Sequence, residues 1–456
     1  MNILAGQKLL TQKEFGKALD LFLNLKKNNV GGNEILFFLG LTYFELNHYN
    51  KSIYYYNKFL KKKPNSKLAL YNMAFVKQSI GRIEDAKNIY LKLLEIDKNK
   101  IRPYYGLFTL NQNFIDNEKF EVILNMKNNF NHSPFEDGMI NYLLSKKEKK
   151  NKNYLKEIEY LNNSHRLVFD SKKIYNKSSQ FYYNEIISKF YDKINFSNND
   201  EKKFKNDEII PIFIIGLPRS GSTLVEAILS SSSKNIHSFG ESHIINMSIL
   251  DQIGSKIYTK NFDKDKFNFE INLKVLSDSI SRRYQQYNLS KNINDKIIID
   301  KSLENFFNID IIKAVFPKAK FLHTFRNTFD SIISIYQSML AELSWTHSIE
   351  DIVIYIDNYI KIVNYFKKKY PTEIMDIELE VLTNDSEKFS KEIYKFCELS
   401  WNSDVLKFYK RENLHSKTLS FGQIRNKISK YDKTKYQPYY NLIKNYQKKF
   451  KWLNLN

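Results

Sequence analysis

The sequence predicts a protein of two parts, an α-helical repeat solenoid followed by an α/β domain with a parallel sheet. Three observations support this prediction. Matched small and aromatic residues recur every 34 residues through the first hundred positions. Glycine and proline are scarce, 13 and 8 in 456 residues, which favours helices over an all-β architecture. From position 209 onward, short β-branched runs alternate with helical patterns, as they do in βαβ units.

The predicted repeats occupy residues 1–126. In each unit a small residue stands where two helices must approach closely, and an aromatic residue stands where the gap must be filled. A helix–turn–helix unit of this period resembles the tetratricopeptide repeat, and Pro64 falls where that repeat has a proline after its second helix. Stacked units leave a concave surface, which either binds a peptide or protein or only packs as a spacer. The matched columns are Gly6, Gly40 and Ala74; Phe15, Tyr49 and Ile83; Ala18, Ser52 and Ala86; Phe22, Tyr56 and Tyr90; and Leu25, Phe59 and Leu93.

Residues 127–208 are predicted to form a helical bridge and a linker. Lysine and asparagine dominate residues 146–153, which indicates a solvated loop there. Apolar residues return at helical spacing in 154–196, and residues 198–207 form a polar hinge.

The last segment, residues 209–456, is predicted to be the α/β domain. It opens with a β-branched apolar run at 209–215, typical of a buried strand. Further strands are expected at 297–299, 320–325 and 374–379, with helices at 224–229, 273–287, 308–315, 328–340 and 349–369. Alternation of this kind predicts a parallel sheet covered on both sides.

Composition restricts the partners of the protein. Lys+Arg (71) exceed Asp+Glu (50), giving a formal net charge of +21, which favours anionic partners. A general bias toward lysine and asparagine is the alternative explanation, and no single basic block dominates, so we expect no nucleic acid partner. The single cysteine, Cys397, excludes an intramolecular disulfide and fits a reducing compartment. The first residues lack signal-peptide features and no apolar run approaches ~20 residues, so we expect a cytoplasmic protein with no transmembrane segment.

The segment 216–223, Gly-Leu-Pro-Arg-Ser-Gly-Ser-Thr, follows the first strand of this domain and opens a helix. Backbone N–H groups at such a turn bind phosphate. Its two glycines have the P-loop spacing, but Ser222 replaces the lysine that contacts the β- and γ-phosphates in nucleoside triphosphatases. The segment therefore favours a phosphosulfate over ATP or GTP, and needs no metal. The rival interpretation is a kinase in which Asp300, after the apolar run 297–299, binds Mg²⁺.

The motif Pro-Arg-Ser-Gly-Ser-Thr at 218–223 resembles the 5′-phosphosulfate-binding loop of sulfotransferases, especially the tyrosylprotein branch. The resemblance implies 3′-phosphoadenosine-5′-phosphosulfate as co-substrate. It also implies that Arg219, Ser220, Gly221, Ser222 and Thr223 hold its 5′-phosphate, and that Arg219 stabilises charge during transfer.

Arg326 and Ser334 follow the predicted strand 320–325 with the spacing of the family's 3′-phosphate motif, RxxxDxxxS. The planar guanidinium of an arginine suits a phosphate because it donates two parallel hydrogen bonds. The competing interpretation of Arg326 is a surface ion pair with Asp330, four residues on.

Residues 300–306, Asp-Lys-Ser-Leu-Glu-Asn-Phe, resemble the family element DKxPxNF, which implies that Lys301 stabilises the bridging oxygen as the donor breaks. Glu241, in Phe-Gly-Glu at 239–241, is similar in position to the base of tyrosylprotein sulfotransferases. The flanking His237 and His243 stay open as alternative bases.

Near the C-terminus, 418–425 resembles the element TxSxxQVR that closes over the donor, with Ser420, Gln423, Arg425 and Lys427 as its binding residues. The family's proline after this element is missing, since Lys427 stands there.

The expected function is therefore transfer of a sulfuryl group to an acceptor hydroxyl, with protein tyrosine as the expected acceptor and the repeats guiding the peptide or protein. A carbohydrate or small-molecule hydroxyl is the alternative acceptor. A catalytically inactive repeat scaffold is the alternative from another class.

Overall fold

The computed structural model describes residues 2–197, 210–231, 236–287, 297–411, 414–418 and 422–454. The chain divides into two compact units. The N-terminal unit contains residues 1–126, 281–293 and 410–425, and the α/β unit contains 127–280, 294–409 and 426–456. Each is described below by itself.

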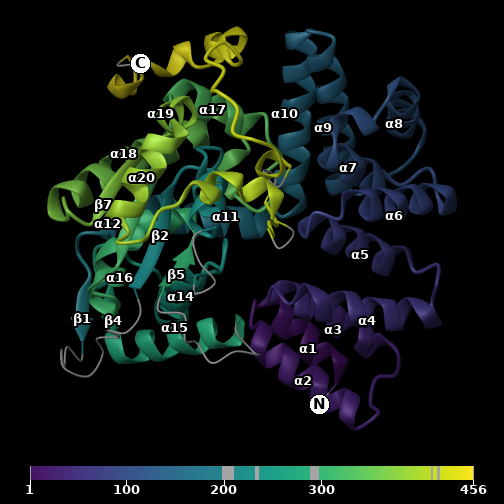
Figure 1. Ribbon diagram of the computed structural model, residues 1–456, viewed down its shortest axis with the longest axis horizontal. Helices are drawn as coiled ribbons and strands as arrows, with labels where there is room; N and C mark the ends of the chain where they lie inside the picture. The colour runs from purple at the N-terminus through teal and green to yellow at the C-terminus, as the bar shows by residue number, and fades with distance from the viewer. Residues whose placement is uncertain are drawn as a thin grey trace. The chain divides into compact units, whose positions relative to one another are not determined.

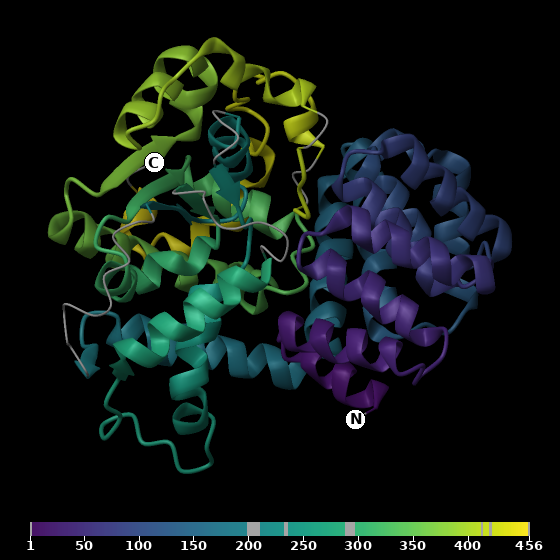
Figure 2. The same cartoon turned by 60° about the horizontal axis from the view of Figure 1, so that its bottom comes forward.

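The N-terminal unit is built from helices that follow one another along the chain as antiparallel pairs (Figure 2). They are α1 (Ile3–Thr11), α2 (Phe15–Lys27), α3 (Glu34–Glu45), α4 (Tyr49–Lys62), α5 (Lys67–Ser79), α6 (Ile83–Ile96), α7 (Ile101–Leu110) and α8 (Asn117–Asn129), with a 3₁₀ turn at Gln112–Phe114.

The recurrent small residues of this unit lie against the recurrent aromatic rings. A Cβ atom added to Gly6 would lie 2.3 Å from the ring of Phe22, and one added to Gly40 would lie 2.9 Å from the ring of Tyr56. Phe22 and Tyr56 are completely buried. Close approach of paired helices, with a ring filling the gap, therefore explains why these two columns recur.

The segment 410–425 belongs to this unit as well. The main-chain N–H of Ser416 donates to Ser79 O over 3.0 Å, and Lys417 Nζ donates to Glu45 O over 3.1 Å. Arg425, in a 3₁₀ turn at Gln423–Arg425, packs on Gly81 and donates to Leu414 O. Gln423 is exposed, and Ser420 lies outside the described residues.

The α/β unit carries a five-stranded parallel sheet in the order β3-β5-β2-β6-β7 (Figure 1). The strands are β2 (Ile210–Gly216), β3 (Ile236–Ser238), β5 (Ile297–Asp300), β6 (Lys320–Phe325) and β7 (Ile374–Glu378), and β1 (Asn195–Ser197) pairs separately with β4 (Glu270–Asn272). The predicted parallel sheet is confirmed. β2 is central and buried almost throughout because its side chains are apolar on both faces.

The helices of this unit are α9 (Pro134–Lys150), α10 (Tyr154–Ser171), α11 (Lys173–Phe181), α12 (Ser188–Phe190), α13 (Ser222–Leu229), α14 (Ile244–Ile257), α15 (Leu273–Tyr287), α16 (Ile309–Val315), α17 (Thr328–Tyr336), α18 (Ile349–Lys369), α19 (Leu379–Asn384) and α20 (Ser386–Phe396). A π-helical turn lies at Tyr182–Ile187, and 3₁₀ segments lie at Leu303–Asn308, Ser344–Thr346, Ser403–Lys410, Gln437–Leu442, Lys444–Tyr446 and Lys451–Asn454. The division between the units falls within α15.

The prediction of a solvated loop at 146–153 is wrong for 146–150, which are helical, and holds for 151–153, an exposed turn between α9 and α10. α9 continues through Lys150, and the side chains of Lys146 and Lys149 turn inward. Lys146 Nζ donates to Gln337 O and Lys149 Nζ donates to Gln337 Oε1, each over 2.6 Å. Lysine is a good helix former whose apolar stem packs on the protein, so lysine content alone does not distinguish a loop from a helix.

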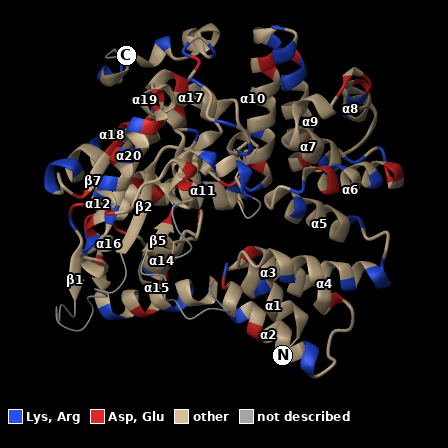
Figure 3. Ribbon diagram, in the orientation of Figure 1, with Lys and Arg blue, Asp and Glu red and all other residues tan. Residues whose placement is uncertain are grey.

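Lysine and arginine are spread over many helices of both units, with aspartate and glutamate between them (Figure 3). This distribution fits a compositional bias better than one binding face. Among the described residues, no helix has both the length and the apolar character of a membrane span.

Candidate active site

The carboxyl ends of four adjacent strands carry the predicted site residues. The loop 216–223 follows β2, Glu241 follows β3, Lys301 follows β5 and Arg326 follows β6. The chain goes from β2 to β3 and β5 on one side and then to β6 on the other. β2 therefore marks the reversal in strand order beside which open α/β sheets bind ligands.

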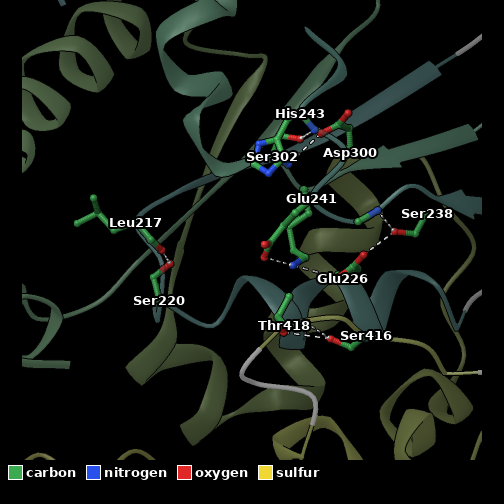
Figure 4. A network of polar contacts seen from close by, with 12 residues as sticks. Leu217, Ser220, Glu226, Ser238, Glu241, His243, Asp300, Ser302, Ser416 and Thr418 are labelled. Carbon is green, nitrogen blue, oxygen red and sulfur yellow. Dashed lines mark hydrogen bonds and ion pairs between the residues drawn. The ribbon is translucent and has the colours of Figure 1, made fainter. Parts of the chain in front are cut away.

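Backbone geometry shapes the loop after β2. Gly216 has φ 140° and its Cβ would lie 2.2 Å from Thr324 O of the neighbouring strand, so only glycine fits there. Gly221 has φ 88°, and Arg219 itself adopts φ 69°, in the left-handed region that is strained for an arginine. Ser220 Oγ donates to Leu217 O over 2.6 Å and contacts Thr324 Oγ1 at 2.9 Å, so its hydroxyl stabilises the loop from within (Figure 4). Ser222 and Thr223 begin α13 and are buried.

Arg326 and Ser334 lie on the strand end and the helix as expected. The Arg326 guanidinium donates to the main-chain oxygen of Asp330 over 2.8 Å. The Asp330 carboxylate accepts hydrogen bonds from the hydroxyls of Tyr431 and Tyr440, which explains why it is not held in a surface ion pair. Arg326 is 8% exposed and its Nε is buried without a hydrogen-bond partner among the described residues. A buried, unsatisfied guanidinium N–H is suited to an anionic ligand.

Tyr436 completes this corner. Its hydroxyl donates to Ser334 Oγ over 3.2 Å, and the Arg326 guanidinium lies 5.2 Å from its ring centroid. Burial opposes ionisation of this phenol, but the positive charges of Arg326 and Lys435 outweigh it and lower the pKa of Tyr436 to about 8.

Lys301 lies between the carboxylates of Glu241 and Glu226, both of which are labelled in Figure 4. Its Nζ is 2.8 Å from Glu241 Oε1 and 3.5 Å from Glu226 Oε2. The Lys301 side chain is 1% exposed, whereas that of Glu241 is 43% exposed. Burial disfavours the ammonium, but Glu241 first and then Glu226 overcome that effect and raise the pKa of Lys301 above its usual value. Lys301 is therefore a permanent buried cation, and Glu241 is its solvent-accessible partner.

Asp300 stabilises the turn on which Lys301 lies. Its carboxylate accepts from Ser242 Oγ over 2.7 Å, from the N–H of Ser302 over 2.9 Å and from Asn305 Nδ2 over 3.3 Å. These bonds fix the turn in which Ser302 and Leu303 follow Lys301. They also occupy the carboxylate that the kinase interpretation assigns to Mg²⁺.

The two histidines have different surroundings. His243 begins α14 with φ 54°; its Nδ1 pairs with Glu304 and its N–H donates to Ser302 Oγ over 2.8 Å. His237 lies on β3, with its ring 4.6 Å from that of Phe239. Glu241, by contrast, forms an ion pair with Lys301.

Three features of this candidate site escaped sequence reasoning. Glu226 lies inside an otherwise apolar helical stretch, Ser-Thr-Leu-Val-Glu-Ala-Ile-Leu, one turn after Thr223, and this isolated acid was the available signal. Lys146 is close enough to Arg219 for the two positive charges to interact, and burial together with Lys149 lowers the pKa of Lys146 to about 7. Tyr436 has no neighbour in the sequence that marks it. The remaining predicted residues, Gln423 and Arg425, belong to the N-terminal unit, and Lys427 is exposed in the α/β unit.

Together these groups provide an anion site at Arg219 and Arg326, a buried cation at Lys301, and an accessible carboxylate beside it. Such a set can stabilise negative charge that develops on a transferred group while a proton leaves for the carboxylate.

The match to a protein-family model supports sulfuryl transfer in general. Residues 211–403 match the model of the Sulfotransferase family. An uncharacterised protein of Aquifex aeolicus is 25% identical over 384 residues, covering 81% of this chain and 48% of its own length. The uncharacterised protein ycf37 of Guillardia theta is 34% identical over 59 residues, covering 13% of this chain and 33% of its own length. The chain thus spans about half of the first relative and a third of the second.

Among solved structures, the sulfotransferase STF1 from Mycobacterium tuberculosis is 13% identical, covers 64% of this chain and 88% of its own, and has a TM-score of 0.31. The sulfotransferase domain of the Synechococcus olefin synthase is 17% identical, covers 49% and 90%, and has a TM-score of 0.30. The family match falls on the stretch from β2 through β7 that carries Arg219, Glu241, Lys301 and Arg326. Residues 211–403 of this chain therefore form a sulfotransferase-family domain.

Proposed function

We propose that the chain transfers the sulfuryl group of 3′-phosphoadenosine-5′-phosphosulfate to the hydroxyl of a tyrosine in a peptide or protein. The observation that carries the chemistry is the Lys301–Glu241 pair, a buried ammonium 2.8 Å from a carboxylate that is 43% exposed. An acceptor can reach Glu241 from solvent, while Lys301 stays inside to meet the leaving group.

The reaction is an in-line displacement at sulfur. The acceptor hydroxyl gives its proton to Glu241 as its oxygen forms a bond to sulfur. The bond between sulfur and the bridging oxygen breaks, and its electron pair stays on the 5′-phosphate of the departing nucleotide. Lys301 and Arg219 stabilise that charge electrostatically, and Arg326 with Ser334 holds the 3′-phosphate.

The tyrosine acceptor rests on the resemblance of the loop 218–223 and of Glu241 to the tyrosylprotein branch. The helix pairs α1–α6, with their 34-residue interval and ring-filled close approaches, support tetratricopeptide repeats as the guide for the peptide.

The first experiment is calorimetric titration of the full chain with 3′-phosphoadenosine-5′-phosphate in EDTA, with ATP as control. We expect tight, metal-independent binding that Arg326→Ala weakens, and much weaker binding of ATP. Preference for ATP with Mg²⁺ would support the kinase, and no binding would support the inactive scaffold.

A second experiment identifies the acceptor. The chain and radiolabelled donor are incubated with a tyrosine-containing peptide, its phenylalanine counterpart, a simple phenol and an oligosaccharide. Transfer to the tyrosine peptide, with a higher kcat/KM than to the phenol and none to the phenylalanine peptide, supports the proposal. Transfer to the oligosaccharide alone contradicts the tyrosine acceptor while leaving the sulfuryl chemistry intact.

A further inference from the structure

Lys301 faces a difficulty during the reaction that one carboxylate cannot resolve. It is completely buried, and an ammonium without a partner in that environment costs several kcal/mol. Glu241 is its nearer partner, at 2.8 Å. When Glu241 takes the acceptor proton, however, it loses the negative charge that balances Lys301.

Glu226 is placed to keep that balance. Its Oε2 lies 3.5 Å from Lys301 Nζ, and its side chain is 14% exposed, against 43% for Glu241. Its other oxygen, Oε1, accepts the hydroxyl of Ser238 over 2.5 Å. A carboxylate held by a serine and shielded from solvent cannot turn toward an acceptor as Glu241 can.

The main chain around Glu226 is closely connected too. Glu226 lies on α13, the helix that the loop 216–223 opens, and Ser238 ends β3. The N–H of Lys301, which follows β5, donates to Gly240 O over 2.9 Å, and a Cβ on Gly240 would lie 3.8 Å from Glu226 Oε1. In Figure 4 the Glu226 and Glu241 side chains point toward one another. Both carboxylates lie within ion-pair distance of Lys301 Nζ. Glu226 thus links the ends of three neighbouring strands at the lysine.

We propose that Glu226 is a positioning residue for sulfuryl transfer: it holds Lys301 in place and balances its charge while Glu241 is protonated. The inference rests on the proposed function, since it assigns Lys301 to the leaving group and Glu241 to the proton. Glu226 touches neither donor nor acceptor in this scheme and acts only through Lys301.

The test is a double-mutant cycle on the full chain, with Glu226→Gln, Lys301→Ala and the double variant. We expect Glu226→Gln to lower kcat by about ten- to a hundredfold, the range of a lost charge-assisted hydrogen bond, with the affinity for 3′-phosphoadenosine-5′-phosphate unchanged. In the Lys301→Ala background the same substitution should change kcat less than about twofold, because its route of action is gone.

Two further variants make the outcome decisive. Glu387→Gln, an exposed acid on α20 paired with Lys391, is the matched control and should keep wild-type kcat. Ser238→Ala leaves the charge of Glu226 and removes only the hydroxyl that holds it, so it tests the idea if Glu226→Gln does not fold; we expect a smaller loss of kcat that also disappears without Lys301. A wild-type kcat in Glu226→Gln, or a loss that is equally large in both backgrounds, overturns the inference. A wild-type chain that neither binds the nucleotide nor transfers sulfate overturns the proposed function itself.

Discussion

The two parts of this chain bury polar groups in different ways. In residues 1–126, the buried polar side chains among the described residues are all neutral: Thr42, Ser52, Gln78 and Ser79. Their partners are local; Ser52, for example, donates to Gly40 O of the paired helix over 2.7 Å. At the carboxyl edge of the sheet, by contrast, the buried polar side chains include the ionisable groups of Asp300, Lys301, Arg326 and Asp330.

This difference separates packing from chemistry. A buried hydroxyl that bonds a neighbouring carbonyl costs little and lets helices approach closely. A buried charge requires partners and often stabilises a protein less than an apolar residue of the same size. Lys301 and Arg326 are therefore better explained by a reaction at the sheet edge than by stability, whereas the buried polar side chains of residues 1–126 are explained by helix packing. Four predictions test this contrast.

The largest effect is expected in the helical region. Phe22→Ala removes a completely buried ring that fills the space opposite Gly6, and such truncations cost roughly 3–5 kcal/mol. The three tryptophans, Trp345, Trp401 and Trp452, all lie in the α/β unit, so their fluorescence reports that unit, while far-UV circular dichroism reports both. We expect the urea transition seen by circular dichroism to move to lower urea, with the tryptophan transition and nucleotide binding unchanged.

The exposed Leu4, which is 70% accessible, provides the control for that experiment, and Leu4→Ala should move neither transition. If Phe22→Ala shifted the urea transition seen by tryptophan fluorescence as much as the one seen by circular dichroism, the packing of the helical region could not be separated from the α/β unit.

The next effect concerns the sheet edge. Arg219→Ala should lower kcat by about a hundredfold to a thousandfold, roughly 3–4 kcal/mol, because a donor aimed at developing charge is lost. The unfolding transition should hardly move, since the strained backbone at φ 69° remains with either side chain. Steady-state kinetics and urea unfolding are measured side by side, with Arg166→Ala on the exposed face of α10 as the control. Full activity in Arg219→Ala would remove the main support for a catalytic sheet edge.

A buried titratable pair away from the edge sharpens the contrast within the α/β unit. His165 Nδ1 lies 3.3 Å from His347 Nδ1, and His165 Nε2 contacts Tyr336 O at 2.7 Å. Burial lowers the pKa of His165 to about 3 and that of His347 to about 4. At neutral pH both imidazole rings are therefore neutral, whereas the Lys301 side chain is charged.

The sign of the pH dependence follows from those values. Below pH 6.5 the unfolded chain takes up protons on both histidines, whereas the folded protein does so only near pH 4 and below, so stability falls as pH falls through this window. Between pH 7 and pH 5 the expected loss is about 2 kcal/mol for each histidine. Urea unfolding followed by tryptophan fluorescence measures it, with His347 only two residues from Trp345. His347→Leu removes one of the two histidines, so it should show about half of the wild-type loss of unfolding free energy between pH 7 and pH 5. An identical pH dependence in variant and wild type would contradict a neutral pair.

Sequence reasoning reached much of this site because its residues follow recognisable strands. The resemblance to family motifs singled out Arg219, Lys301 and Arg326, and the short apolar runs that became β2, β5 and β6 placed them at the ends of parallel strands, which lie at one edge of the sheet. Glu226 was not predictable in that way, since its role depends on the 3.5 Å distance across two loops to Lys301. The position of Lys146 could not be predicted from composition, because a lysine-rich segment has the same composition whether its lysine side chains point into solvent or into the protein.

The smallest expected effect tests how the sheet edge manages its charge. Tyr436 lies against Arg326 and its pKa is lowered to about 8, so above pH 8 its phenolate neutralises the guanidinium that the 3′-phosphate needs. The affinity for 3′-phosphoadenosine-5′-phosphate should fall about tenfold between pH 7 and pH 9, or roughly 1.4 kcal/mol.

The side chain at position 436 cannot ionise in Tyr436→Phe, so the affinity of this variant should match the wild type at pH 7 and lack that decline. Calorimetric titrations at pH 7, 8 and 9 measure it, with Tyr409→Phe, a tyrosine of the 3₁₀ segment Ser403–Lys410, as the matched control. Tyr436→Phe also removes the hydrogen bond from Tyr436 to Ser334. An equal decline in affinity between pH 7 and pH 9 in this variant would assign the pH dependence to the ligand rather than to this tyrosine.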